Sequence, residues 1–340
     1  MDKRVAVNCL DDLIARGQAA GPVRVAVADA AQEVVLATMR RAIADGLAEP
    51  HLVGPRAEIE SLAAAAGLPL DTVCLHDSAA DAQAAQLAVG LVRRGEADVV
   101  MKGNLHTDVF MRVLLNAETG LRVPGKRVSH LFLLDVPGHD RLIGVTDAAI
   151  NITPDLEAKA QICQNAVDAL HAIGVVEPRV AALSAVETVT PSIVSTLDAA
   201  SLTLMARRGQ IVGAVVDGPL AFDNAVSPRA VAEKGIISDV AGRADILLVP
   251  DLVSGNILAK ALEYLGGARA AAVALGLAAP VILTSRADTE EARIASLALA
   301  ALLRMPAART AKTGELHRSL RAAPASETNC CPLPHPGGAK

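Results

Sequence analysis

Short apolar runs alternate with longer Ala-rich amphipathic stretches along most of the chain. The apolar runs cover residues 23–30, 97–103, 130–136, 141–148, 179–186, 210–218, 244–251 and 280–286. Runs of this length are typical of buried strands, and most of the intervening stretches are long enough to hold a helix. The pattern therefore predicts an α/β protein, with mostly parallel strands and flanking helices.

Three helix starts in the middle of the chain carry a local signal. At each one, a Ser or Thr precedes a Pro, as expected for an N-cap followed by the first helical residue. A Gly then stands where each helix is expected to stop. The pairs are 153–154, 190–191 and 227–228, and the stops are Gly174, Gly209 and Gly235.

The chain has 340 residues, more than one hydrophobic core usually supports, so two domains are expected. From residue 305 onward the sequence becomes small, polar and Pro-rich, which predicts a disordered tail over 305–340. The sequence has no internal repeat and no GxGxxG, Walker A or GxSxG motif. The usual dinucleotide, triphosphate and hydrolase fingerprints are therefore absent.

Composition excludes several classes of partner. Hydrophobic residues make up 52% of the chain but aromatic residues only 1%, which argues against a stacking platform for single-stranded nucleic acid. The formal net charge of -5 gives no general attraction for DNA or an acidic membrane. The longest uncharged run in the C-terminal half, Ala270–Ser285, is too short to span a bilayer. Acidic residues near the N-terminus interrupt any signal-peptide core, so a cytoplasmic location is expected.

The five cysteines do not predict a disulfide framework. Cys9, Cys74 and Cys163 are far apart in apolar or helical contexts, and we expect them to be buried free thiols. The remaining two lie in the predicted tail. No Cys or His spacing fits a zinc site, so no metal is expected.

Polar residues follow several of the predicted strands, Asn256 among them, and ligands bind at the carboxyl ends of the strands in parallel sheets. We therefore expect these residues to gather at one edge of the sheet. Lys102, His106 and Thr107 follow one strand and lead into a helix that carries Arg112. Ser285 and Arg286 follow the last strand. Arginines, hydroxyl groups and helix N-termini all suit an anion, so this pattern predicts a phosphate site without a P-loop.

Simpler roles compete with this interpretation. Asp288 stands three residues before Glu291, as in a capping box, and Thr107 or Asp108 could do no more than cap the next helix. His106 fits an ordinary loop histidine. The pair Ser285-Arg286 favours function more strongly, because an Arg at the end of a buried strand is costly unless an anion meets it.

With these loops, the chain resembles the phosphate acetyltransferase and phosphate butyryltransferase family. The matching pieces run in order from about residue 95 to residue 300, and the wording of "DGPLAFDNAVS" and "TSRAD" is closer to the butyryltransferase branch. The other pieces are "MKGNLHTD", "RVSHLFLLDVPGH", "TDAAINITPDLEAK", "ALSAVETVTP" and "ADILLVPDLVSGNILAK". The resemblance implies a two-domain fold related to isocitrate dehydrogenase, with the active site in the interdomain cleft. We place one discontinuous domain at 1–127 plus 265–304 and the other at 128–264.

The resemblance also implies the reaction acyl-CoA + phosphate = acyl phosphate + CoA, with an acetyl or butyryl group. Coenzyme A is then a substrate, no cofactor is tightly bound, no metal is needed, and the protein is a homodimer. Ser285 and Arg286 match the family's active-site Ser-Arg pair, and Arg112 matches an arginine shortly after the "HT" loop. Ser129 and Asn256 lie in matching pieces and join the expected substrate-binding residues Lys102, His106 and Thr107.

One position departs from the family pattern. The acetyl enzymes carry an Asp seven residues beyond the serine, proposed as the base for the CoA thiol, and that offset falls here on Ala292. Asp288, Glu290 and Glu291 are the nearby candidates for the base, and a base elsewhere in the chain stays open.

Two other functions stay open. A non-catalytic protein that binds CoA or phosphate would explain the missing base. A dehydrogenase of the same fold would need metal-binding carboxylates in the stretch Gly255–Lys260, where Asn256 and Lys260 stand instead.

Overall fold

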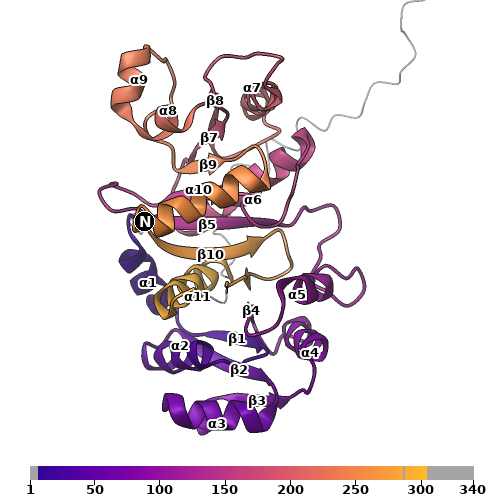
Figure 1. Cartoon of the computed structure of the whole chain (residues 1–340). Helices are drawn as coiled ribbons and strands as arrows, with labels where there is room; N and C mark the ends of the chain where they lie inside the picture. The colour runs from indigo at the N-terminus through magenta and orange to yellow at the C-terminus, as the bar shows by residue number, and fades with distance from the viewer. Residues whose placement is uncertain (1–6, 286–287, 305–340) are drawn as a thin grey trace, which may run out of the picture. The chain divides into compact units, whose positions relative to one another are not determined.

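The computed structural model describes residues 7–285 and 288–304, which form one eleven-stranded sheet with helices on both faces (Figure 1). The strand order is β3-β2-β1-β4-β11-β10-β5-β6-β9-β7-β8. The strands are β1 (Val23–Ala28), β2 (Ala48–Gly54), β3 (Cys74–Asp77), β4 (Val99–Lys102), β5 (Ser129–Asp135), β6 (Ile143–Thr146), β7 (Arg179–Leu183), β8 (Val215–Leu220), β9 (Ile246–Leu248), β10 (Arg269–Leu275) and β11 (Val281–Ile282). The helices are α1 (Leu10–Ala19), α2 (Glu33–Ala44), α3 (Arg56–Ala66), η1 (Leu70–Thr72), α4 (Asp81–Arg93), α5 (Thr107–Leu114), α6 (Leu156–Ala172), α7 (Val194–Arg207), α8 (Phe222–Val226), α9 (Pro228–Lys234), α10 (Leu252–Tyr264) and α11 (Glu290–Arg304).

The predicted mostly parallel sheet is confirmed, but its centre is antiparallel. The strands from β3 to β11 are parallel to one another, and so are β6, β9, β7 and β8. Between these groups, β10 pairs antiparallel with both β11 and β5, and β5 pairs antiparallel with β6. The two parallel groups therefore run in opposite directions, and their carboxyl ends lie at opposite edges of the sheet.

All eight predicted strand segments overlap a strand, and three strands were missed. The missed β10 has the sequence RAAAVAL, and its alanines are the strongest helix formers. The missed β2 and β3 carry polar residues such as Glu49 and His76, because β3 is the edge strand and β2 lies next to it. Neither local pattern identifies a strand.

The three predicted helix caps had different outcomes. The Ser227-Pro228 start is confirmed: Ser227 caps α9 and accepts the Ala230 N–H, and Gly235 ends the helix with a positive φ. The Thr153 prediction is wrong, because Asp155 caps α6 instead. The Thr190 prediction is also wrong, because α7 begins after Ile193.

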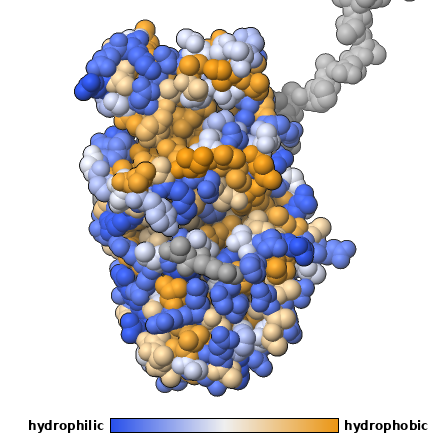
Figure 2. Space-filling model, in the orientation of Figure 1, coloured by the Kyte–Doolittle hydropathy of each residue, from blue (hydrophilic) through white to orange (hydrophobic). Residues whose placement is uncertain are grey.

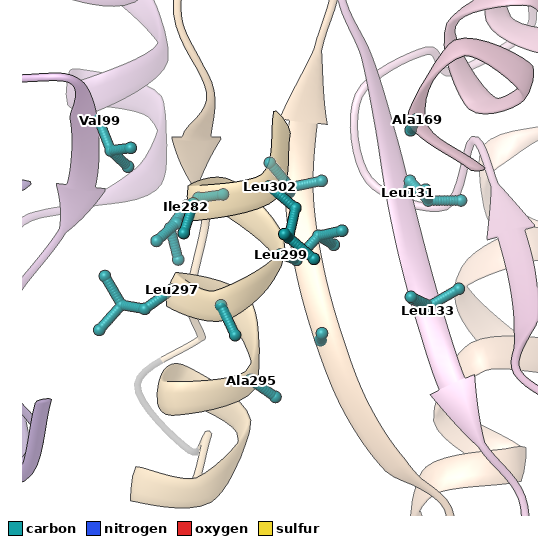
Figure 3. Close-up of a cluster of buried hydrophobic side chains, with 14 of the residues drawn as sticks. Val99, Leu131, Leu133, Ala169, Ile282, Ala295, Leu297, Leu299 and Leu302 are labelled. Carbon is teal, nitrogen blue, oxygen red and sulfur yellow. The ribbon is translucent and has the colours of Figure 1, made fainter. Parts of the chain in front are cut away.

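A large apolar core lies on the face of the sheet covered by α11. In Figure 3, Leu297, Leu299 and Leu302 of this helix pack against Ile282 and neighbouring strand residues. Almost every residue in the second half of α11 is buried, so the helix is fixed against the sheet. The start of α11, which follows the Ser285 loop, is thereby held in place.

The cysteine prediction is corrected in part. Cys163 is buried in α6, and burial raises the pKa of its thiol to about 12. Cys9 is half-buried, and Cys74 is exposed because it lies on the edge strand β3. In the part of the chain that the structure describes, no helix is long and apolar enough to cross a membrane.

By their contacts, the described residues group as one compact unit. The predicted boundary between residues 127 and 128 stays a prediction. The predicted tail, 305–340, lies outside the described residues.

Candidate functional site

The chain leaves β4 by crossing directly over the end of β1. The Gly103 N–H donates to the Ala28 carbonyl at 2.8 Å, and the Asn104 N–H donates to the Asp29 carbonyl at 2.7 Å. A Cβ on Gly103 would lie 1.9 Å from the Asp29 carbonyl oxygen, so only glycine fits here. The crossing leaves Lys102, the last residue of β4, with only 2% of its surface exposed.

The loop after β11 is tied to the end of β4. The Thr284 hydroxyl donates to the Lys102 carbonyl at 2.9 Å. The Ser285 N–H donates to the Asp288 carboxylate at 2.7 Å, and the Asp288 N–H donates back to the Ser285 carbonyl at 3.2 Å. The structure thus brings Lys102, Ser285 and Asp288 to one edge of adjacent strands. Arg286 follows Ser285 in the sequence but lies outside the described residues, so its predicted role stays a prediction.

Arg293, in the first turn of α11, binds the loop after β11 through three hydrogen bonds. We did not predict this role from the sequence. Its guanidinium donates to the Thr284 hydroxyl at 2.7 Å, to the Ser285 carbonyl at 2.9 Å and to the Asp288 carbonyl at 3.4 Å. The side chain is 1% exposed, and burial lowers its pKa. The sequence signal that could have identified this role is an arginine within an Ala- and Leu-rich helix. A buried arginine needs polar partners inside the protein.

The surroundings of Asp288 make it a stronger base than an ordinary aspartate. Burial raises the pKa of its carboxyl above the usual 3.8, although the Ser285 N–H and the charge of Lys260 act in the opposite direction. The competing capping-box role of Asp288 is not observed. Thr289 takes that position, since its hydroxyl accepts the Ala292 N–H at 3.2 Å.

Lys260 of α10 extends the polar site toward β5. Its ammonium lies 5.8 Å from the ring centre of Phe132 and 2.8 Å from the Glu263 carboxylate. Its charge lowers the pKa of both Asp288 and His130, so it lies within electrostatic reach of both. We predicted no role for Phe132 or His130 from the sequence.

His130 of β5 is a fully buried imidazole. Neither ring nitrogen has a hydrogen-bond partner among the described residues, and the ring meets that of Phe132 edge-on at 4.6 Å between centres. Burial lowers the pKa of His130 to about 4, while the charge of Asp147 raises it and that of Lys260 lowers it. At neutral pH the imidazole is therefore uncharged.

Three of the predicted residues, His106, Thr107 and Arg112, are exposed, the first two at the start of α5 and the third in its last turn. His106 is the N-cap residue of this helix, with no side-chain capping bond, and Thr107 is its first residue. The competing interpretation, in which Thr107 or Asp108 caps the helix, is therefore wrong. Arg112 is 80% exposed and lies 3.9 Å from the Asp108 carboxylate one turn away.

Ser129 and Asn256 lie at the opposite edge of the sheet. Ser129 is buried at the start of β5, opposite Leu275, and its hydroxyl accepts from the Asn165 amide at 2.9 Å. The Asn256 amide donates to the Ala148 carbonyl, just after β6, at 3.2 Å. The expectation that the residues after the strands share one edge is thus wrong for Asn256, because the antiparallel β10 and β5 reverse the strand direction. The predicted binding roles of both residues stay predictions.

The structure gives no indication of a metal centre in residues 7–285 and 288–304, where no three His, Cys, Asp or Glu residues are grouped to hold an ion.

Comparison with known proteins places these loops in a family. Residues 79–301 match the family described as phosphate acetyl/butaryl transferase. The chain belongs to this family. A phosphate acetyltransferase of Rhizobium meliloti is 51% identical over 292 residues, which cover 86% of this chain and 92% of that protein. A phosphate butyryltransferase of Clostridium acetobutylicum is 43% identical over 297 residues, covering 87% and 98%.

A solved structure agrees with the sequence match. A branched-chain phosphotransacylase from Enterococcus faecalis V583 has a TM-score of 0.73 and 29% identity, and covers 83% of this chain and 99% of that one. The matched region of this family member includes both the Lys102 loop and the Ser285 turn. Because relatives carry acetyl and butyryl names alike, the predicted butyryltransferase branch stays a prediction.

Proposed function

We propose that this family member transfers a short acyl group, acetyl or butyryl, reversibly between coenzyme A and inorganic phosphate. The observation that carries the proposal is the family match over residues 79–301, which spans the Lys102 loop and the Ser285 turn. Acyl-CoA and phosphate are then its substrates, and no tightly bound cofactor is required.

In the forward direction, a phosphate oxygen attacks the thioester carbonyl, and the CoA thiolate leaves and takes up a proton. In reverse, the thiol loses that proton to a base and attacks the carbonyl of the acyl phosphate, whose bond to phosphate breaks so that inorganic phosphate leaves. A thiol with a pKa near 8.5 is a few per cent ionised at neutral pH, so a modest base suffices. Asp288 is our candidate, because its pKa is raised by burial.

Stabilising the charge on the reacting groups is the larger task. Arg286 and Arg112 are assigned to the phosphate, since an arginine can hold two of its oxygens at once. The Ser285 hydroxyl and nearby backbone N–H groups are assigned to the carbonyl oxygen, where charge develops in the tetrahedral intermediate. Lys102, His106 and Thr107 complete the proposed binding residues on the Ser285 side of the sheet, and Ser129 and Asn256 are the proposed binding residues at the opposite edge.

The proposed active site lies in a cleft between the domains 1–127 plus 265–304 and 128–264. The composition of the sheet supports this division. Strands β3, β2, β1, β4, β11 and β10 come from residues 23–102 and 269–282, whereas β5, β6, β9, β7 and β8 come from residues 129–248. The proposal also keeps the expected cytoplasmic location.

We further propose a homodimer, and the exposed face of α10 supports it. Val253 and Ile257 on this helix are 60% and 64% exposed, and Leu265 just after it is 90% exposed. Figure 2 shows hydrophobic residues gathered along α10. Exposed apolar patches of this kind commonly mark protein interfaces.

Substitution of the Ser-Arg pair tests the proposed chemistry. Arg286→Ala is expected to lower phosphate-dependent thiol release from acyl-CoA by on the order of a hundredfold, as for the loss of one preorganised donor. Arg208→Ala, at the exposed end of α7, is the matched control and is expected to keep full activity. Near-normal turnover of Arg286→Ala would contradict the assignment of Arg286 to the phosphate.

A further inference from the structure

The connection between α5 and β5, residues 115–128, is fixed at both ends. The Ala278 N–H donates to the Leu121 carbonyl at 2.8 Å, and the Arg127 N–H donates to the Gln161 side chain at 2.9 Å. Between these anchors, Pro124 and Gly125 form a tight turn in which Gly125 has a φ of 75° and Lys126 bonds back to Val123 at 3.1 Å. The α5–β5 connection is therefore a shaped segment with defined side-chain positions.

A cavity of about 440 Å³ lies between this connection, the loop after β6 and the start of α6. Three cationic side chains line it, Arg122, Lys126 and Arg127, against one carboxylate, Glu157. This excess of positive charge is local, since the chain as a whole has a formal net charge of -5. Ile150 and Leu115 add an apolar wall, and the volume is within the range of small-ligand sites.

The three cations of this cavity lack carboxylate partners. None of them forms an ion pair with any residue within 7–285 or 288–304. The cavity of about 480 Å³ near the N-terminal segment is different. Its Arg141 and Arg179 lie 3.7 Å and 4.0 Å from the Asp245 carboxylate, so their charge is already balanced. Of these two cavities, only the one beside the α5–β5 connection has cationic side chains whose charge is not balanced by a carboxylate partner.

The loop after β6, which supplies Ile150 and Asn151 to the cavity lining, is held in place by a buried carboxylate behind it. Asp147, 2% exposed, accepts the backbone N–H groups of Ala149 and Ile150 at 2.9 and 3.0 Å and also binds the Asn151 side chain. The Asn151 oxygen in turn accepts from the Arg127 guanidinium at 3.2 Å. Arg127 is thus oriented before any ligand arrives, which lowers the entropy that binding must overcome.

We infer that this cavity binds the phosphate groups at the adenosine end of coenzyme A, an inference that rests on the proposed function. Three cations suit a ligand with several phosphate charges, and the apolar wall suits a purine. The site is also in reach of the chemistry. Leu115, on its rim, follows directly after α5, whose 8 residues span about 12 Å from the Lys102 loop. The extended arm between the adenosine phosphates and the thiol of coenzyme A covers such a distance.

The double variant Arg122→Gln/Lys126→Gln tests the assignment, and Arg207→Gln/Arg208→Gln on α7 is the control with the same change of charge. We expect the KM for acyl-CoA to rise at least tenfold with kcat little changed. The KM values for phosphate and for an acyl-pantetheine, which lacks the adenosine phosphates, should stay unchanged. Adenosine 3′,5′-bisphosphate should inhibit the wild type competitively against acyl-CoA and inhibit the double variant at least tenfold more weakly.

Three results would overturn the inference: an unchanged KM for acyl-CoA, an equal rise for acyl-pantetheine, or a rise in the KM for phosphate alone. Failure of the proposed function is a separate result, in which the wild type releases no thiol. Calorimetry with coenzyme A still decides the inference in that case. Wild-type binding that weakens at least tenfold in the double variant supports it, and equal or absent binding contradicts it.

Discussion

Arg293 shows how a single buried side chain can shape a site that it does not line. Its guanidinium binds one hydroxyl and two carbonyl groups of the turn from Thr284 to Asp288. These acceptors lie beside the Ser285 position where the proposed reaction takes place. The ammonium of a lysine could satisfy one or two of them but lacks the planar geometry that reaches all three.

Removing the Arg293 guanidinium should damage both stability and turnover. Arg293→Met is expected to lower the free energy of unfolding by on the order of 2–4 kcal/mol, because it leaves buried carbonyl groups unsatisfied, and to lower kcat at least tenfold. Urea unfolding and thiol-release kinetics measure the two effects. Arg304→Met, on the same helix and bonded to carbonyls far along the chain at Pro22, is the control and should keep kcat. A stable, fully active Arg293→Met protein would contradict this account.

His130 predicts a dependence of stability on pH. Its pKa is lowered to about 4 in the folded protein, so below pH 6.5 the unfolded chain binds a proton that the folded one excludes. Stability from this group is therefore complete above about pH 6.5 and is lost as the pH falls toward 4, by on the order of 3 kcal/mol.

Unfolding curves of His130→Gln between pH 7 and pH 4 check this expectation. The variant should lose less stability than the wild type over that range, while His106→Gln, at an exposed loop position, should follow the wild type. Parallel curves for the wild type and His130→Gln would exclude His130 as the source of the pH dependence.

At the scale of elements, local signals succeeded where one residue decides the outcome. The Ser227-Pro228 start and the Gly235 stop of α9 are right because capping depends on the residue itself. The start of α6 is wrong because Asp155, two residues beyond Thr153, competes for the same helix end. The strand β10 was missed because its pairing with β5, far away in the sequence, outweighs the helix preference of its alanines.

The path of the connection between β4 and α5 depends on Gly103. Gly103→Ala should destabilise the protein by more than about 2 kcal/mol, since its Cβ would meet the backbone of Asp29 and move the Lys102 loop. Gly90→Ala in α4 is the control and should be neutral or stabilising, because its Cβ would meet only the end of the Arg94 side chain. Thermal unfolding compares them, and a stable Gly103→Ala protein would show that the crossing can relax.

For the whole molecule, sheet topology decides which predicted residues meet. Lys102 and Ser285 were predicted together and are found together, because β4 and β11 are parallel neighbours. Ser129 and Asn256 are found at the other edge, because the reversal at β10 and β5 involves pairings that no local sequence pattern encodes. Arg293 was missed for a related reason, since its partners lie in a loop whose path depends on the packing of α11.

The proposed homodimer makes a prediction for the whole protein in solution. Ile257→Asp on α10 places a charge in the exposed apolar face and should convert the dimer to a monomer in sedimentation velocity experiments. Glu177→Asp, on an exposed loop, should leave the dimer intact. A wild type that sediments as a monomer, or a variant that stays a dimer, would exclude this face as the interface.

The central claim is that the site transfers an acyl group between coenzyme A and phosphate. The most direct measurement is thiol release by the purified wild type from acetyl-, propionyl- and butyryl-CoA, with and without phosphate. The account predicts release that requires phosphate, an equal amount of acyl phosphate, and a ranking of the three substrates that identifies the acyl preference. Confirmed acyl-CoA binding without phosphate-dependent release would contradict it, and would favour a non-catalytic CoA-binding protein.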